Sequence, residues 1–132
     1  MSTRRRTDPA AGQQALEAWC SAHICSAAGV DRTTLATAVR FALEEFAARH
    51  PGGSVEVRVP PFGVTQAVEG PRHTRGTPPS TVETDPATWL RLVTGTVEFA
   101  DARTRSAVVA SGVRADIGHL LPLFDAQGRS LG

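Results

Sequence analysis

The sequence has no lysine, no asparagine and no tyrosine, and its aromatic residues are five Phe and two Trp. Arginine therefore supplies all of the fixed positive charge, which the acidic residues offset to a formal net charge of +1. Binding to a phosphate backbone needs a concentrated basic face, whereas these arginines are interspersed with acidic residues. The composition argues against a nucleic-acid partner.

The sequence also lacks long apolar runs. No segment approaches the ~18 apolar residues that a membrane-spanning helix needs. Arg4-Arg5-Arg6 has the charge of an export signal, but the following residues, Thr7 to Glu17, contain no continuous apolar run. The sequence therefore predicts a soluble, cytoplasmic protein that makes no stable membrane insertion.

Only two cysteines are present, and they lie five residues apart in a segment with helical spacing. Cys20 and Cys25 therefore point to different faces of one helix and cannot bridge each other without breaking it. Two reduced thiols in a cytosol fit this spacing. With His23 they make three metal-type donors, but no fourth ligand stands nearby, so neither a metal site nor a cofactor is expected.

A chain of 132 residues is long enough for one domain with a single core. We place this domain at residues 8–124, with residues 1–7 and 125–132 as flexible tails.

Aspartates at three positions mark the starts of three helices. Asp8-Pro9 and Asp85-Pro86 each combine an N-cap with a proline at the first helical position, and Asp31 caps a helix that ends at residues 50–53. Gly29 stops the first helix and Gly95 the third. The later pattern allows one or two further turns at 96–103 and predicts a last short helix at 115–121.

After residue 53 the apolar period changes to two. Val55, Val57 and Val59 predict a half-buried strand. A second strand at 62–68 forms an antiparallel hairpin with it, and its apolar face is predicted to carry Phe62, Val64 and Val68, interrupted by Gln66. An edge-like strand at 80–84 and a central strand at 107–111 follow. Together the elements predict an α+β protein of two layers, with helices on one face of a mainly antiparallel sheet.

Several short motifs follow one another in a particular order in the later part of the chain. They are residues 69–90 (EGPRHTRGTPPSTVETDPATWL), Gly95, Ser111-Gly112 and residues 120–123 (LLPL). This order resembles the bacterial branch of the sterol carrier protein (SCP2-like) family, including its actinobacterial members. The family's pattern of an acidic helix start, leucines, glycines and a leucine-rich end is matched by Asp85, Leu90, Leu92, Gly95, Ala100, Gly112, Leu120 and Leu121.

The resemblance implies a sheet of roughly five strands, backed by helices around an apolar tunnel, and a non-enzymatic carrier of lipid-like apolar molecules. The rigid loop from Pro71 to Pro79 and a C-terminus without a peroxisomal signal depart from better-known members, so sterol itself is not implied. A related domain is an appendage of thiol-dependent isomerases in actinobacteria, but their helical metal domain is absent here.

Affinity for such a ligand has to come from apolar burial. The candidate lining consists of large apolar side chains, each of which also suits ordinary core packing: Phe41, Phe46, Trp89, Phe99, Leu120, Leu121 and Phe124. Few bulky aromatic groups are available to fill a tunnel, which favours an open one.

Arg72, His73 and Arg75 crowd one loop and are candidates for binding a carboxylate or phosphate head group. The alternative is a solvated turn, in which each exposed ion pair contributes only about 0 to 1 kcal/mol.

Two other functions stay open. One is a protein-interaction module that keeps the fold with a filled tunnel and binds a protein partner or a second copy of itself through a sheet edge or the loop. The other is an enzyme that uses His73, although no catalytic residues are assigned and no nucleophile motif such as G-x-S-x-G is present.

Overall fold

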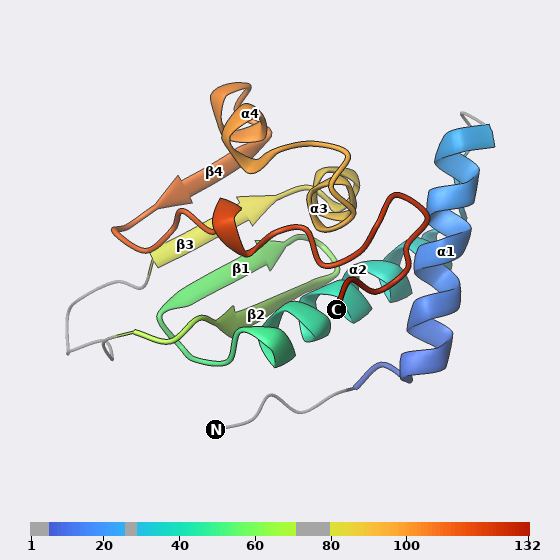
Figure 1. Ribbon diagram of the computed structural model, residues 1–132, viewed down its shortest axis with the longest axis horizontal. Coiled ribbons are helices and arrows are strands. Elements are labelled where there is room, and N and C mark those ends of the chain that lie inside the picture. Colours follow the sequence, from blue (N-terminus) through green and yellow to red (C-terminus); the bar gives the residue numbers. More distant parts are fainter. Residues whose placement is uncertain (1–5, 26–28, 71–79) are drawn as a thin grey trace.

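The computed structural model of the protein describes residues 6–25, 29–70 and 80–132, without the side chains of residues 23–25. The helices are α1 (Pro9–Cys25), α2 (Arg32–Arg49), α3 (Pro86–Val93), α4 (Phe99–Thr104) and a short 3-10 turn, η1 (Gly118–Leu120). The strands are β1 (Val55–Val59), β2 (Gly63–Ala67), β3 (Ser80–Thr84) and β4 (Val108–Ser111), and they form one sheet in the order β2-β1-β3-β4 (Figure 1).

The three predicted N-caps are confirmed. Asp8 accepts a hydrogen bond from the backbone N–H of Ala11 at 3.1 Å, and Asp31 accepts one from Thr34 at 2.7 Å. Asp85 accepts two bonds from Thr88, one from its backbone N–H at 2.9 Å and one from its hydroxyl at 2.8 Å. Each cap pairs a backbone donor that the first turn of a helix leaves without an intrahelical acceptor.

The sheet is mixed, with two antiparallel strand pairs and one parallel pair, and the described residues contain four strands where roughly five were expected. The α+β class is confirmed. Ala67 at the end of β2 pairs with Val55 at the start of β1, and Ser80 at the start of β3 pairs with Val55 from the other side. The chain thus leaves β2 and enters β3 at the same end of the sheet, so β3 runs parallel to β1.

The predicted positions of the last two strands within the sheet were wrong. The strand at 80–84, expected at an edge, lies inside between β1 and β4, while β4 is the edge. Within β4 only Val108 is buried, and Val109 and Ser111 are exposed. The predicted helix at 115–121 shrinks to η1, because the Asp116 carboxylate accepts the Gly118 N–H at 3.2 Å and competes with helical bonding.

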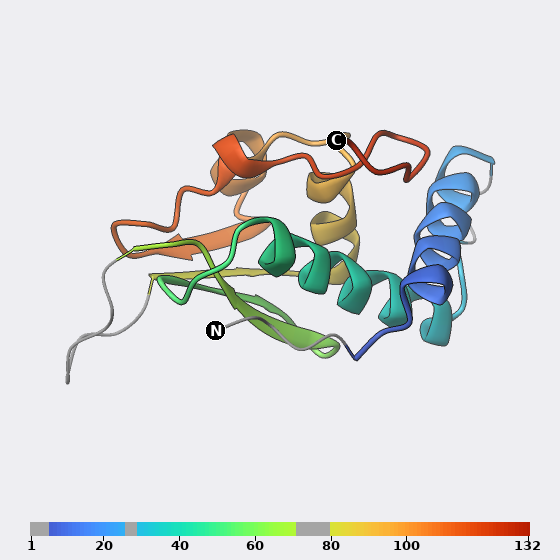
Figure 2. The ribbon, with the colours of Figure 1, turned by 60° about the horizontal axis from the view of Figure 1, so that its bottom comes forward.

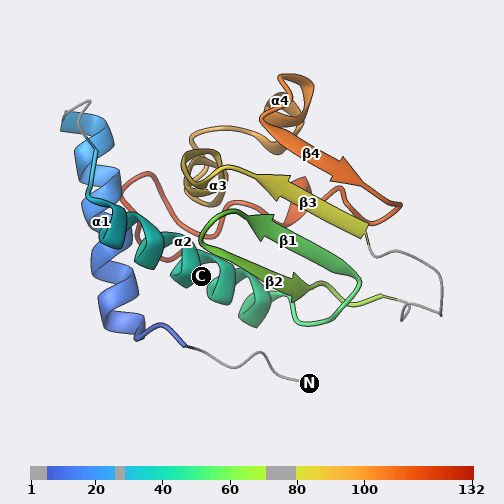
Figure 3. The same cartoon turned by 180° about the vertical axis from the view of Figure 1, so that it is seen from behind.

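Helices α2 and α3 and the C-terminal segment lie on one face of the sheet (Figure 2). The opposite face, towards the viewer in Figure 3, is covered by none of the segments that the structure describes. Arg58, Gln66 and Glu83 are exposed there, together with Val64 and Val109, whose exposed fractions are 57% and 64%.

The predicted apolar face of β2 was wrong by one residue. Val64 points to solvent, whereas Thr65 and Ala67 are buried. The buried positions carry small side chains because α2 packs closely on this strand: a Cβ on Gly63 would lie 3.1 Å from Cδ1 of Leu43. A side chain at Gly63 would therefore require the end of the Leu43 side chain to move.

Helix α1 packs against α2 beyond the end of the sheet (Figure 1). The contact depends on Gly12, since a Cβ there would lie 2.4 Å from ring atoms of Phe41 and 2.6 Å from its Cβ. Real Cβ atoms do not approach other carbons so closely, so the two helices can pack together here only because Gly12 has no side chain.

Replacing Gly12 by alanine is therefore expected to destabilise the protein by about 2 kcal/mol. In an isolated helix the same change would stabilise by about 1 kcal/mol, because alanine is the better helix former. Urea unfolding of both proteins measures the difference, with Ala18→Gly at an exposed position of α1 as the propensity control. If Gly12→Ala raised the stability, the proposed close contact with Phe41 would be wrong.

Candidate ligand-binding site

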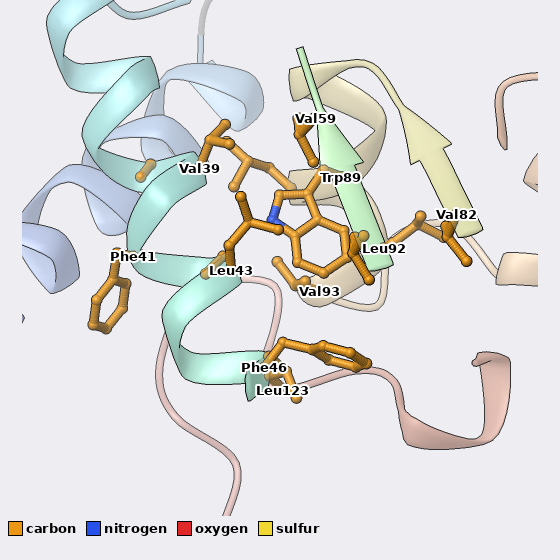
Figure 4. Packing of buried hydrophobic residues seen from close by; sticks show 14 of the residues in the cluster. Val39, Phe41, Leu43, Phe46, Val59, Val82, Trp89, Leu92, Val93 and Leu123 are labelled. Atoms are coloured by element: carbon orange, nitrogen blue, oxygen red, sulfur yellow. The ribbon is translucent and has the colours of Figure 1, made fainter. Parts of the chain in front are cut away.

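Trp89 of α3 and Phe46 of α2 lie at the centre of the layer between the sheet and its helices. Their ring centroids are 5.9 Å apart at an interplanar angle of 83°, an edge-to-face contact. Neither side chain has any exposed surface. Figure 4 shows Val39 and Leu43 of α2 and Val59 of β1 around the indole, so these two predicted lining residues meet in an apolar environment.

The indole N–H of Trp89 has no hydrogen-bond acceptor within the described part of the chain. In Figure 4 its nitrogen is turned towards α2, on the side of Leu43 and Val39. An unpaired buried donor costs about 1–3 kcal/mol, and an ordered water needs about two to four polar partners, which these neighbours do not offer. The N–H is suited to an oxygen atom that a bound molecule brings with it.

Phe41 and Phe124 form a separate aromatic pair, with centroids 5.8 Å apart and planes tilted by 37°. Phe41 lies on the other side of α2 from Trp89 (Figure 4). The Arg49 guanidinium stands over the Phe124 ring, 5.7 Å from its centroid. This pair therefore fills the space between α2 and the C-terminal segment.

The other predicted lining residues lie elsewhere in the core. Phe99 begins α4, and a Cβ on Gly118 would lie 3.2 Å from its Cβ. Leu120 and Leu121 are half-buried and pack against the edge of the core. The structure thus brings Phe46 and Trp89 together, and Phe41 with Phe124, rather than gathering the whole set around one axis.

Arg72, His73 and Arg75, the predicted head-group residues, lie outside the described residues, and their role stays a prediction.

The chain leaves β2 through Val68, whose φ of 69° is rare for a β-branched residue. Ser54 holds it there, because its backbone N–H and its hydroxyl both donate to the Val68 carbonyl, at 3.1 and 2.7 Å.

A cavity of about 160 Å³ lies between α3 and α4, at a place that the sequence analysis did not single out. Thr88 and Ala102 in its wall are buried, whereas Arg91 and Arg105 are exposed, so two positive charges stand at its rim. The full lining is Thr88, Arg91, Val97, Ala102, Arg105 and Ala107. Sequence shows two arginines near the ends of two short helices, but not that those helices enclose a space.

Cys20 is buried and reduced. Burial raises the pKa of its thiol to about 11, with smaller contributions from the carboxylates of Asp125 and Glu17. The thiol is therefore protonated at neutral pH and unsuited to act as a nucleophile or a metal ligand. The side chains of His23 and Cys25 lie outside the described part, and the described residues contain no group of three His, Cys, Asp or Glu side chains placed to hold a metal ion.

The sequence profile of the family described as "Bacterial SCP ortholog" matches residues 31–123. The chain belongs to this bacterial SCP family. Among curated proteins, none matches the chain significantly.

The part of this bacterial SCP protein that matches the family runs from the cap of α2 to Leu123, so it includes the whole described sheet, α3 and α4. Trp89, Phe46 and the cavity between α3 and α4 lie inside the match, whereas α1 precedes it. Of the helices described, none combines the length and the hydropathy needed to cross a membrane.

Proposed function

We propose that this bacterial SCP protein is a cytoplasmic, non-enzymatic carrier that binds a lipid-like apolar molecule between the sheet and helices α2 and α3. Membership of the SCP family supports the class of function. The N–H of Trp89 is the observation that supports placing the ligand here, since it is a buried donor in apolar surroundings that lacks an acceptor among the described residues. The favoured ligand is apolar and has an oxygen acceptor near one end.

Affinity would come from the apolar part of the ligand. At ~0.8 kcal/mol per buried CH₂, about ten methylenes supply a gross gain comparable to a micromolar dissociation constant, before ordering costs are subtracted. Since Phe46 and Trp89 have no exposed surface, the ligand has to displace side chains as it enters. We therefore expect uptake to be much slower than diffusional encounter.

The other residues of the predicted site would contribute either apolar surface or positive charge. Phe99, Leu120 and Leu121, all buried or half-buried, would extend the apolar lining, whereas Phe41 and Phe124 form a separate pair and would support the site from the other side of α2. Arg72, His73 and Arg75 would receive the head group if the ligand carries an anion.

The test is native mass spectrometry of the protein purified gently from its own host, followed by organic extraction of any bound molecule. We expect a stoichiometric lipid-like adduct, and saturable uptake of a fluorescent fatty acid by the stripped protein. A bare chain that also fails to take up the fatty acid would overturn the carrier function.

A second candidate function, the protein-interaction module, is favoured by the uncovered sheet face. Val64 and Val109 are exposed on its two outer strands. Between them lie Arg58 of β1 and Glu83 of β3, which are directly opposite each other in the strand register. Failure of the carrier test together with a stable complex or dimer that Val64→Ser with Val109→Ser disrupts would establish this alternative.

A further inference from the structure

The cavity between α3 and α4 has two arginines at its rim and a mixed, mostly small lining beneath them. Its buried lining residues are Thr88 and Ala102, Val97 and Ala107 are half-buried, and the exposed Arg91 and Arg105 stand at the rim. Trp89 does not line this cavity. A ligand here would therefore occupy a place distinct from the proposed carrier site.

Both arginines are placed by tightly bonded helix ends. In α3 the Thr96 N–H donates to the Arg91 carbonyl at 3.0 Å and the Gly95 N–H to the Leu92 carbonyl at 3.3 Å, a Schellman motif with Gly95 at φ 76°. The Thr96 hydroxyl also donates to the Arg91 carbonyl at 3.3 Å, and the Thr94 hydroxyl donates to the Leu90 carbonyl at 2.7 Å. The backbone beneath Arg91 is thus fixed.

Helix α4 ends in the same way. The Ala107 N–H donates to the Ala102 carbonyl at 2.9 Å and the Ser106 N–H to the Arg103 carbonyl at 3.1 Å. Ser106 has a φ of 61° in the position that glycine usually takes. This turn sets Arg105 between two lining residues, Ala102 before it and Ala107 after it.

Neither rim arginine is neutralised by a carboxylate. In the described ranges no Asp or Glu lies within ion-pair distance of Arg91 or Arg105, although the chain forms such pairs elsewhere, as between Arg58 and Glu56. Asp85, which contacts the lining residue Thr88, uses both carboxylate oxygens to accept from the Thr88 N–H and hydroxyl. Two guanidinium groups are therefore free to bind an anion.

The size of the cavity limits the rest of the ligand. The hollow offers about 160 Å³ and is open to solvent on one side, so it has room for a single ring or a short branched chain that stays partly in water. We propose that the cavity between α3 and α4 binds a monocarboxylate with a ring-sized apolar body, whose carboxylate is held by Arg91 and Arg105. Paired arginines bind a carboxylate through directional, charge-assisted hydrogen bonds, while Val97, Ala102 and Ala107 offer apolar contacts to one face of the ring.

Benzoate is the probe. Titration of the ¹⁵N-labelled protein at low salt is expected to give saturable amide shifts that are largest at the cavity-lining residues Arg91, Val97 and 102–107, with a dissociation constant on the order of 1 mM. Benzyl alcohol, which keeps the ring but lacks the charge, and acetate, which keeps the charge but lacks the ring, are each expected to bind at least about ten-fold more weakly.

The variant Arg91→Gln with Arg105→Gln should lose about ten-fold in benzoate affinity. Arg103→Gln is the matched control, because Arg103 is exposed on α4 but does not line the cavity. If the double variant fails to fold, the single variant Arg105→Gln and the weakening of wild-type binding by added salt take its place.

The proposal would be overturned by shifts that do not saturate or that centre elsewhere, by equal affinities for benzoate and benzyl alcohol, or by equal losses in Arg103→Gln and the double variant. The test is independent of the carrier function, because its readout is the amides of the residues that line this cavity, which include neither Trp89 nor Phe46, and because it uses no lipid. If the protein binds benzoate here but takes up no fatty acid, this site is supported and the carrier function is contradicted.

Discussion

Replacing Arg49 by alanine is expected to destabilise the protein by about 3 kcal/mol. One guanidinium nitrogen, Nη1, donates to the carbonyls of Leu123 and Leu131 at 3.0 and 2.7 Å, and Nη2 donates to the Ser130 hydroxyl. The same group covers the Phe124 ring. Arg49 thus fastens the C-terminal segment, residues 123–131, to the end of α2.

The loss would spread into the core, because the same segment is also bound to α3. The backbone N–H groups of Leu123 and Phe124 both donate to the Val93 carbonyl at 2.9 Å. Leu123 and Phe124 are almost fully buried, so loosening the segment uncovers apolar surface. Residues 125–132, expected from sequence as a flexible tail, carry part of this network.

Urea unfolding measures the effect, with Arg103→Ala as the matched control at an exposed arginine. Arg49→Lys should fall between wild type and Arg49→Ala, because an ammonium group keeps the charge but not the fork that serves several acceptors. A loss below about 1 kcal/mol in Arg49→Ala would show that these bonds only replace equally good bonds to water.

Local signals in the sequence predicted the elements well, and the pairing of those elements less well. Each aspartate cap lies within three residues of the donor that it binds, so the starts of α1, α2 and α3 follow from local chemistry. The order of the strands depends instead on which end of the sheet the chain returns to after β2. Alternation of apolar residues holds no information on that choice.

The face of β2 shows why periodicity misleads where packing is tight. Val64 is the more apolar residue, yet Thr65 and Ala67 are the buried ones, on a strand where Gly63 already lies close beneath Leu43 of α2. A pattern that ranks residues by hydrophobicity alone selects the wrong face. The requirement for a small residue is visible only once Leu43 is seen above Gly63.

In the candidate site too, local features could be predicted from the sequence and the relative placement of elements could not. That Phe46 and Trp89 are buried was within reach of the sequence, because both follow helical apolar spacing. That the indole N–H has no acceptor among the residues that the structure describes, and that Arg91 and Arg105 share a rim, depends on the relative placement of separate elements. Sequence reasoning therefore found the aromatic residues but missed the unpaired donor and the cavity.

The second large effect concerns Trp89, where two substitutions separate packing from hydrogen bonding. Trp89→Ala removes a fully buried indole and is expected to cost about 3–5 kcal/mol in the free energy of unfolding. Trp89→Phe also loses volume, but it removes the unpaired N–H, whose burial costs about 1–3 kcal/mol. We expect Trp89→Phe to remain within about 1 kcal/mol of wild type in urea unfolding.

Ligand binding should respond in a different order. If the N–H donates to an oxygen of the bound molecule, Trp89→Phe should bind dodecanol about five- to ten-fold more weakly than wild type while binding dodecane equally well. Phe46→Leu, which alters the neighbouring ring but no hydrogen-bonding group, is the control and should affect both ligands alike. Equal losses for dodecanol and dodecane in Trp89→Phe would show that Trp89 acts only by its shape, since a missing hydrogen bond cannot affect a ligand that has no acceptor.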